Sequence, residues 1–336
     1  MNENLQSTRR RFLQSTGLGM AAGAGGLRQA VALATQAGDS GLLAPRLAHH
    51  TPRAKRIIML FFTGGFSQVD TFDYKPSLWK IEGEKLPKPP GFLGQLEAYL
   101  DVGNAAMPTP FKFSQYGQCG RYISTLFPRI AESVDDLAFI YGIEVESNNH
   151  APATMHVNTG SQFPGAASVG AWITYGLGSP NQNLPGYVVI HDRRGAPQNG
   201  AAVWSNGFLP TSHQGTVFRP SGTPILHLRS PQGLGRDRQR KEFDLIKWLN
   251  ENHLDQRPSE VELEARIHSY ELAFRMQTEA PELMSIDGES EATRQLYGLD
   301  DPVTRDFGLR CLMARRLSLI HISEPTRPRL IAYAVF

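Results

Sequence analysis

Two carboxylates follow the first apolar run of the chain. Residues 63–73 read Thr-Gly-Gly-Phe-Ser-Gln-Val-Asp-Thr-Phe-Asp, so a turn with two glycines leads to Asp70 and Asp73. Carboxylate oxygens bind hard divalent cations, and softer cations such as zinc add imidazole ligands. The pattern predicts that Asp70 and Asp73 bind a divalent metal, and a capping role in a following turn is an equal alternative for each.

His150 stands in a second polar cluster, beside Asn149 and just before a segment with helical character. Free N–H groups at the start of a helix bind anions, so we expect Asn149 to bind substrate and His150 to bind a metal. His156 lies six residues further on and points to a different helical face, which disfavours one metal held by both imidazoles. A structural role is the alternative for His150.

Weaker patterns surround two other histidines. His213, in a Ser-His-Gln run, is a candidate substrate-binding residue. His191 and Asp192 follow an apolar run, where they either contact a substrate anion or form a turn exposed to solvent. The solvent-exposed turn is the favoured interpretation. The chain contains no G-x-x-x-x-G-K-[ST], G-x-S-x-G or H-E-x-x-H motif, which excludes P-loop proteins, ordinary serine hydrolases and zincins.

Alternating apolar runs and helical segments must position these residues. Continuous apolar runs predict strands over residues 56–62, 137–141 and 187–190. Helices are expected over residues 128–134, 151–158, 168–175, 259–279 and 304–316, with an irregular segment over 195–240. Unbroken apolar runs are typical of strands buried on both faces of a parallel sheet. We therefore expect an α/β sandwich whose functional residues gather at the carboxyl ends of the strands.

Composition and charge narrow the class of protein. The 336 residues are 40% hydrophobic and 20% charged, which is typical of a globular chain. Residues 1–56 carry a net charge of +6, which leaves −4 for the rest and gives no basic face for nucleic acid. No apolar run reaches the roughly 18 residues of a membrane span. The two cysteines, far apart in sequence, predict neither a zinc ribbon nor a disulfide framework.

The first 34 residues have the pattern of a twin-arginine export signal. Arg9 and Arg10 precede a Phe-Leu pair and a weakly apolar, glycine-rich and alanine-rich stretch, and Ala-Leu-Ala at residues 32–34 is a plausible cleavage site. We expect residues 35–55 to be a linker and the protein to reach the periplasm or the medium through the twin-arginine export machinery. A basic disordered tail is the alternative.

The other end of the chain has an unusual sequence. Residues 317–336 resemble the translation of adapters used in sequencing libraries, and they interrupt the helix expected over 304–316 without a cap or turn signal. We expect these residues to be a non-native tail and the natural chain to continue past Arg316, so His321 and Glu324 are not candidate ligands. The chain as written should then fold poorly and bind metal weakly. A genuine C-terminal strand and loop is the alternative.

One long run and several short ones resemble a known family. Residues 61–76 read Phe-Phe-Thr-Gly-Gly-Phe-Ser-Gln-Val-Asp-Thr-Phe-Asp-Tyr-Lys-Pro, and further runs follow in order at residues 110–118, 149–150, 159–162, 170–178, 181–185, 207–210, 213–215 and 270–277. Together they resemble an exported bacterial family, domain of unknown function 1501, related to sulfatases and alkaline phosphatases. The resemblance covers residues 56–316. It implies an alkaline phosphatase or sulfatase-like α/β sandwich, incomplete at its C-terminal end.

The related superfamily implies a divalent metal and a Ser, Thr or modified Cys nucleophile that attacks sulfate or phosphate esters. Counting back from residues 159–160 places His150 at the position of the sulfatase nucleophile and Thr154 at that of its arginine partner. Glycines at residues 64–65 replace the paired aspartates common in sulfatases. The implied site then consists of the metal ligands Asp70, Asp73 and His150 and the nucleophile Thr154 or Ser67.

Two functions are consistent with these residues. The first is an exported, metal-dependent hydrolase of sulfate or phosphate esters, with a sulfated or phosphorylated carbohydrate as a candidate substrate. The retained Asp70, Asp73, Asn149 and His150 favour it. The second is a noncatalytic protein that binds a polysaccharide or a partner on the same fold. The loss of the sulfatase nucleophile and arginine favours this second function.

Overall fold

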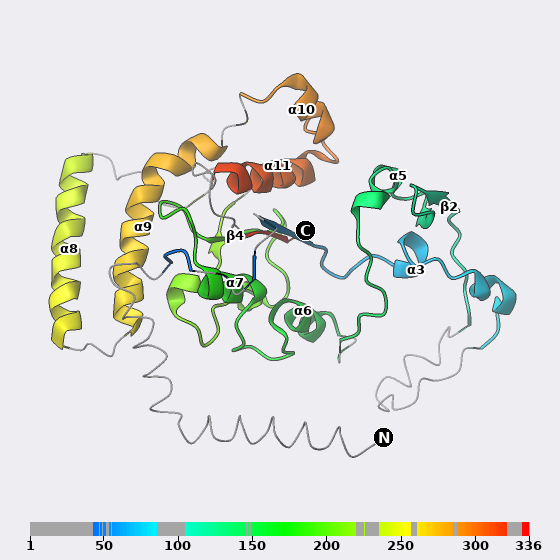
Figure 1. The fold of residues 1–336 in the computed structure, drawn as a ribbon, viewed down its shortest axis with the longest axis horizontal. Helices are drawn as coiled ribbons and strands as arrows, with labels where there is room; N and C mark the ends of the chain where they lie inside the picture. The colour runs from blue at the N-terminus through cyan, green and yellow to red at the C-terminus, as the bar shows by residue number, and fades with distance from the viewer. Residues whose placement is uncertain are drawn as a thin grey trace, which may run out of the picture.

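The computed structural model describes residues 43–46, 48, 50, 51, 54, 56–85, 105–145, 147, 149–219, 225, 235–256, 261–284, 286, 288–320 and 331–335. Within these residues the chain is a mixed α/β protein with a central sheet and several helices (Figure 1). The expected export signal, with Arg9 and Arg10, lies outside the described residues.

A parallel sheet occupies the centre of the molecule. Its strand order is β1 (Ile57–Phe61), β6 (Ile331–Val335), β4 (Tyr187–Ile190) and β5 (Thr216–Val217). Every residue of β4 is buried, and successive side chains point to opposite faces of the sheet. Tyr187 and Val189 pack in the same cluster as Met155, whereas Val188 and Ile190 pack in a second cluster with Leu317. The two clusters form the core on either side of the sheet.

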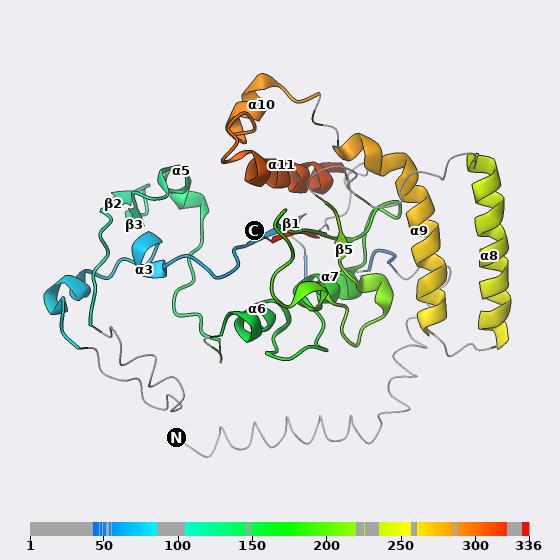
Figure 2. The same ribbon diagram turned by 180° about the vertical axis from the view of Figure 1, so that it is seen from behind.

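Helices cover both faces of this sheet. Figures 1 and 2 show α6 (His150–Thr159) and α7 (Val169–Leu177) on one side and α11 (Arg305–Ile320) on the other. The Asn149 side chain caps α6 by accepting the N–H of Ala151 at 3.2 Å, and Gly160 ends the helix with a φ of 75°. A buried methionine at residue 155 fixes the middle of α6 on the sheet.

A smaller lobe stands to one side of the sheet (Figures 1 and 2). Its elements are α3 (Gln68–Thr71), the 3-10 helix η1 (Pro76–Ile81), the antiparallel pair β2 (Phe113–Tyr116) and β3 (Arg121–Ser124), α5 (Pro128–Ala131) and the 3-10 helix η2 (Val134–Asp136). Ile123 and Val134 are fully buried there beneath aromatic rings such as Phe72 and Phe127, which stack at 5.1 Å. This lobe therefore has its own small core.

The remaining described elements lie after β4. They are the 3-10 helices η3 (Gly200–Trp204) and η4 (Thr211–His213), then α8 (Arg236–Gln256), α9 (Val261–Met284) and α10 (Glu291–Leu296). α8 and α9 lie side by side at the far end of the molecule from the small lobe, with α9 on the inner side (Figures 1 and 2). Phe243 and Phe274 join the two helices edge to face, at 5.4 Å between ring centroids.

Most of the predicted elements are confirmed, with four differences. The strands predicted over 56–62 and 187–190 correspond to β1 and β4, and the helices predicted over 151–158, 168–175 and 304–316 correspond to α6, α7 and α11. Residues 137–141 are not a strand, because Phe139 and Tyr141 pack against Arg121 of the small lobe, not within the sheet. The helix predicted over 128–134 is divided between α5 and η2.

β1 and α8 also differ from expectation. β1 is not buried on both faces: Ile58 is 41% exposed and Leu60 48%, because β1 is the edge strand of the described sheet. The irregular segment expected over 195–240 gives way to α8 from Arg236 onward. Ion pairs at i,i+4 spacing, such as Arg238 with Glu242 at 3.3 Å, support this helix along its exposed side.

The C-terminal segment takes part in the described structure. α11 continues past its predicted end at Arg316 as far as Ile320, and Leu317 is buried in the core beside β4. Residues 331–335 form β6, which pairs in parallel with both β1 and β4. Among the described residues, no helix is long and apolar enough to cross a membrane.

Candidate functional site

The carboxyl ends of β1 and β4 lie at one edge of the sheet, because the strands of this sheet run in parallel. Phe61 ends β1 and leads into the glycine turn at residues 63–65. Ile190 ends β4 and leads into His191 and Asp192. Loops at such an edge are where ligands bind in open α/β sheets.

The start of α6 is tied to the same edge. The side-chain amide of Asn199, in the loop that follows β4, donates a hydrogen bond to the carbonyl oxygen of Ala151 in the first turn of α6. Met155 of α6 packs together with Phe61, the last residue of β1. Asn149 and His150 are exposed at this helix start. The edge therefore combines the first N–H groups of a helix with an exposed imidazole.

His191 is held in a defined orientation. Its ring stacks on Trp204, with centroids 6.3 Å apart and an interplanar angle of 13°. Its Nδ1 lies 2.8 Å from the carbonyl oxygen of Asp192, so Nδ1 carries the proton and donates it. This tautomer leaves Nε2 as the acceptor, which suits a general base or a metal ligand.

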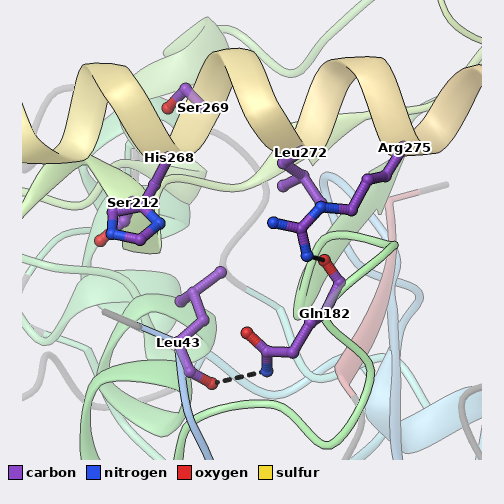
Figure 3. A pocket seen from close by; sticks show the side chains of 7 residues that line it. All are labelled: Leu43, Gln182, Ser212, His268, Ser269, Leu272 and Arg275. Atoms are coloured by element: carbon purple, nitrogen blue, oxygen red, sulfur yellow. Dashed lines mark hydrogen bonds between the residues drawn. The ribbon is translucent and has the colours of Figure 1, made fainter. Parts of the chain in front are cut away.

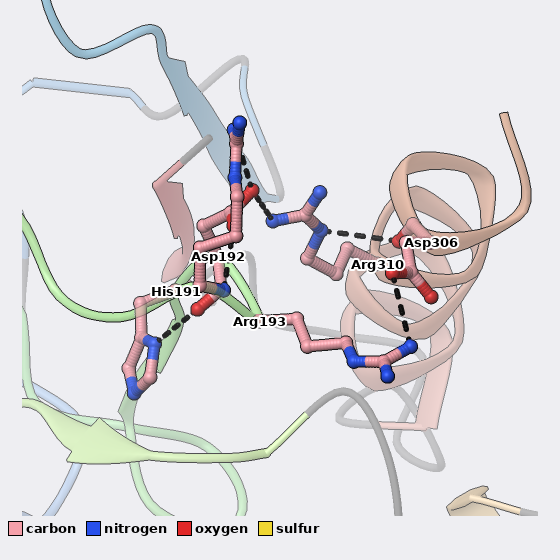
Figure 4. Close-up of polar contacts among 6 residues, drawn as sticks. His191, Asp192, Arg193, Asp306 and Arg310 are labelled. Carbon is pink, nitrogen blue, oxygen red and sulfur yellow. Dashed lines mark hydrogen bonds and ion pairs between the residues drawn. The ribbon is translucent and has the colours of Figure 1, made fainter. Parts of the chain in front are cut away.

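Asp192 is surrounded by cations and serves as an anchor (Figure 4). The N–H and Nε of Arg194 donate to Oδ1 at 2.8 and 2.9 Å, and Nη1 of Arg310 donates to Oδ2 at 2.7 Å. The hydrogen bond from Arg194 is the largest cause that holds the pKa of Asp192 well below its usual value. Because Arg310 belongs to α11, this pair connects the end of β4 to the helix above the sheet.

The buried guanidinium of Arg310 has a second partner. Only 5% of the Arg310 side chain is exposed, and its Nε donates to the carbonyl oxygen of Asp306 at 3.1 Å. The Asp306 carboxylate lies 3.5 Å from Arg193. Asp192 and Arg193, the two residues directly after His191, therefore both pair with residues of α11. Figure 4 shows the His191 ring on the side away from α11.

Asp70 belongs to α3 and Asp73 follows it, and α3 lies in the small lobe, apart from α6, which begins at His150 (Figures 1 and 2). Hydrogen bonds from the hydroxyls of Thr109 and then Ser67 lower the pKa of Asp70. Asp73 pairs with Lys75 at 2.9 Å. The structure thus gives both carboxylates local partners and does not bring them together with His150.

A divalent metal does not fit the described residues. They contain no group of three or more His, Cys, Asp or Glu side chains that could hold a metal ion. Asp192, the carboxylate closest in sequence to His191, is already bound by two arginines. A metal site at this edge would need ligands from residues outside the described ranges.

The other predicted site residues have different environments. Thr154 exposes only 9% of its surface, on the second turn of α6. Ser67 is exposed but belongs to the small lobe, where its hydroxyl bonds to Asp70. Neither hydroxyl is presented openly at the sheet edge, which weakens both as nucleophiles.

His213 is a core residue. It is 1% exposed, its Nδ1 lies 3.2 Å from Oγ1 of Thr174, and its ring meets that of Tyr175 edge to face. Burial first, and the charge of Arg46 second, lower the pKa of His213 to about 4. A neutral imidazole packed in this way stabilises the fold and does not face a substrate.

A small pocket of about 50 Å³ lies between Leu43 and α9 (Figure 3). Arg275 and His268 extend from α9, and Leu43, Gln182 and Ser212 line the other side. The hydroxyl of Ser212 is buried without a hydrogen-bond partner among the described residues. About 10–15 Å³ of such space is enough to hold a water molecule, so the pocket has room for water. Because Gln182 precedes β4, the pocket lies at the edge opposite His191.

Sequence reasoning ranked His191 low and missed Asn199, Trp204 and Arg310. A usable signal existed for Arg310, since it lies in a predicted helix just before the apolar residues Leu312, Met313 and Ala314, which are buried. A cation at such a position needs a carboxylate partner. No comparable pattern marks Asn199 or Trp204, whose roles depend on the fold of the loop after β4.

Comparison with known proteins gives one match. The model of a family described as "Protein of unknown function (DUF1501)" matches residues 54–319, which is most of the chain. No curated protein and no solved structure matches. The sheet edge, the small lobe and the α8–α9 pair, up to residue 319, all lie within the matched residues.

Proposed function

We propose that this chain, which belongs to the DUF1501 family, binds and hydrolyses sulfate or phosphate esters at the carboxyl edge of its sheet. The observation that supports the proposal is the meeting of three features at that edge. These are the glycine turn after β1, the oriented imidazole of His191 after β4, and the start of α6 with Asn149 and His150.

The chemistry of each feature suits an anionic ester. The first N–H groups of α6 and the positive end of its dipole attract the ester oxygens. The Nε2 lone pair of His191 accepts a proton from an attacking water, and the exposed His150 imidazole in its protonated form donates one to the departing alcohol oxygen. Water gives one proton to His191 and His150 gives one to the alcohol oxygen, so the balance closes when the proton on His191 returns through solvent to His150.

Export and a metal cofactor are further parts of the proposal. The leader supports passage through the twin-arginine machinery to the periplasm or the medium. A divalent cation would neutralise charge on the transferred group when bound. The described residues do not form its site, so its ligands would come from other residues of the protein.

Hydrolysis is tested with His150→Ala and His191→Ala in the purified protein. Turnover of 4-nitrophenyl sulfate and 4-nitrophenyl phosphate is measured, together with metal content by mass spectrometry. We expect each variant to lower kcat about 100-fold, as removal of a general acid or base does. His253→Ala, at an exposed position on α8, is the matched control. Unchanged turnover in both site variants would refute the assignment, as would folded protein that turns over neither ester.

The second candidate function is noncatalytic binding of a polysaccharide. One observation favours it: the small lobe exposes Trp79 (42%) and Tyr122 (39%), and Tyr122 stacks on Tyr74 at 4.5 Å. Exposed aromatic faces are suited to contact with sugar rings. Calorimetry with dextran sulfate tests this function, and Trp79→Ala should abolish binding while Trp172→Ala, at an exposed tryptophan on α7, should not.

A further inference from the structure

α8 presents an apolar surface on the side that faces away from α9. Gln239, Arg240 and Phe243 face α9, where Arg240 lies 2.9 Å from Glu271. At 100° per residue, Leu245 and Trp248 fall on the opposite side of the helix. Leu245 is 57% exposed and Trp248 58%, and Leu249 beside them is 53% exposed. Both ribbon views show this side of α8 at the outer limit of the molecule (Figures 1 and 2).

Charge is distributed unevenly along the same helix. Residues 236–243 carry four Lys or Arg and two acids, whereas residues 244–256 carry three acids and one Lys. On the outer side, Arg238 and Lys241 precede the apolar residues and Asp255 follows them. The apolar surface therefore lies near the middle of α8, between a basic and an acidic half.

We propose that α8 pairs antiparallel with α8 of a second copy of this chain, about a twofold axis near residues 246 and 247. A single register pairs Leu245, Arg238 and Lys241 with residues of the second copy at once. It places Leu245 against Trp248 of the partner subunit and Arg238 against Asp255 of the partner subunit. Lys241 then faces Asn252 of the partner subunit. By symmetry every contact occurs twice, as in a closed dimer.

The charge pattern is the reason to choose a second copy as the occupant. In the antiparallel arrangement the basic half of each α8 meets the acidic half of the other. The helix dipoles are also antiparallel, so each positive end lies near a negative end. A helix of 21 residues is about 32 Å long, so a single helix pair makes a small interface and a dimer that dissociates at micromolar concentrations.

Sedimentation of the intact chain at 1–100 µM tests the dimer. We expect the mass to rise with concentration toward twice the 37.2 kDa of one chain. Arg238→Glu and Asp255→Arg should each raise the dimer dissociation constant about 100-fold, roughly tenfold for each of the two symmetric contacts. The double variant Arg238→Glu with Asp255→Arg should restore the original constant, because the pair is re-formed with exchanged charges.

Arg129→Glu is the matched control. It breaks an exposed ion pair at the end of α5, Arg129 with Glu132 at 3.1 Å, just as Arg238→Glu breaks the pair with Glu242. Its dissociation constant should equal that of the parent, and circular dichroism confirms that every variant is folded. A monomer at 100 µM overturns the proposal, even if another protein binds α8. The proposal is also overturned if neither Arg238→Glu nor Asp255→Arg changes the dissociation constant, or if the double variant does not restore it.

Discussion

The ion pair between Asp192 and Arg310 gives a test in which one carboxylate has a buried and an exposed partner. The Arg310 side chain is 5% exposed and that of Asp192 17%, whereas Arg194, the other partner, is 89% exposed. Asp192→Asn removes the carboxylate charge beside the buried Arg310 guanidinium and should lower the free energy of unfolding by about 3 kcal/mol. Arg310→Met should cost less, about 2 kcal/mol, because Asp192 keeps Arg194 and some access to water.

Arg194→Ala is the internal control, because an exposed ion pair contributes little to stability. It should leave the unfolding free energy within experimental error, although it removes two of the hydrogen bonds to Asp192. Urea unfolding followed by circular dichroism gives the free energy of unfolding of each variant. The three free energies are comparable only if the dependence of each on urea concentration has the same slope. The order Asp192→Asn, Arg310→Met, Arg194→Ala is the prediction. A loss in Arg194→Ala equal to that in Asp192→Asn would refute the reasoning from burial.

Three further predictions concern other parts of the fold. Gly178→Ala should destabilise the protein by about 3 kcal/mol in urea unfolding, because Gly178 has a φ of 69° and a Cβ there would clash with the carbonyl oxygen of Ala44. Folding lowers the pKa of His213 from 6.5 to about 4. The free energy of unfolding is therefore higher by up to about 3 kcal/mol above pH 6.5, where this imidazole is neutral, and that gain is lost as the pH falls toward 4. His213→Gln should remove that part of the pH dependence of stability. Asp135→Asn should accelerate amide hydrogen exchange at Cys119, whose N–H bonds to the Asp135 carboxylate at 2.9 Å.

Elements whose sequence pattern is local could be predicted. β4 is an unbroken apolar run between polar residues, and it is buried along its whole length. α6 and α7 each begin after an Asn or Ser and end at a glycine with positive φ, which are signals readable from sequence. The segment 137–141 is an apolar run like β4, but it pairs with no strand among the described residues, because its aromatic rings pack in the small lobe. An apolar run indicates that a segment will be buried, but it does not indicate which surface will bury it.

The candidate site was less predictable, because its geometry depends on which distant residues meet. Asp70 and Asp73 were attractive metal ligands by spacing, and only the fold reveals Thr109 and Lys75 as their partners. Asp192 directly follows a strand, which is a common position for a ligand-binding residue. In the structure it is bound by Arg310, more than a hundred residues later in the chain.

His191 differs from these carboxylates, because its ring is oriented by its own loop, through Trp204 and the Asp192 carbonyl oxygen. A functional imidazole at a strand end must be held in position without both of its nitrogens being used in that contact. His191 meets that condition: it is oriented by stacking and one hydrogen bond, and its second nitrogen keeps its lone pair. For this reason His191, more than any carboxylate predicted from sequence, is the residue on which the hydrolase proposal depends.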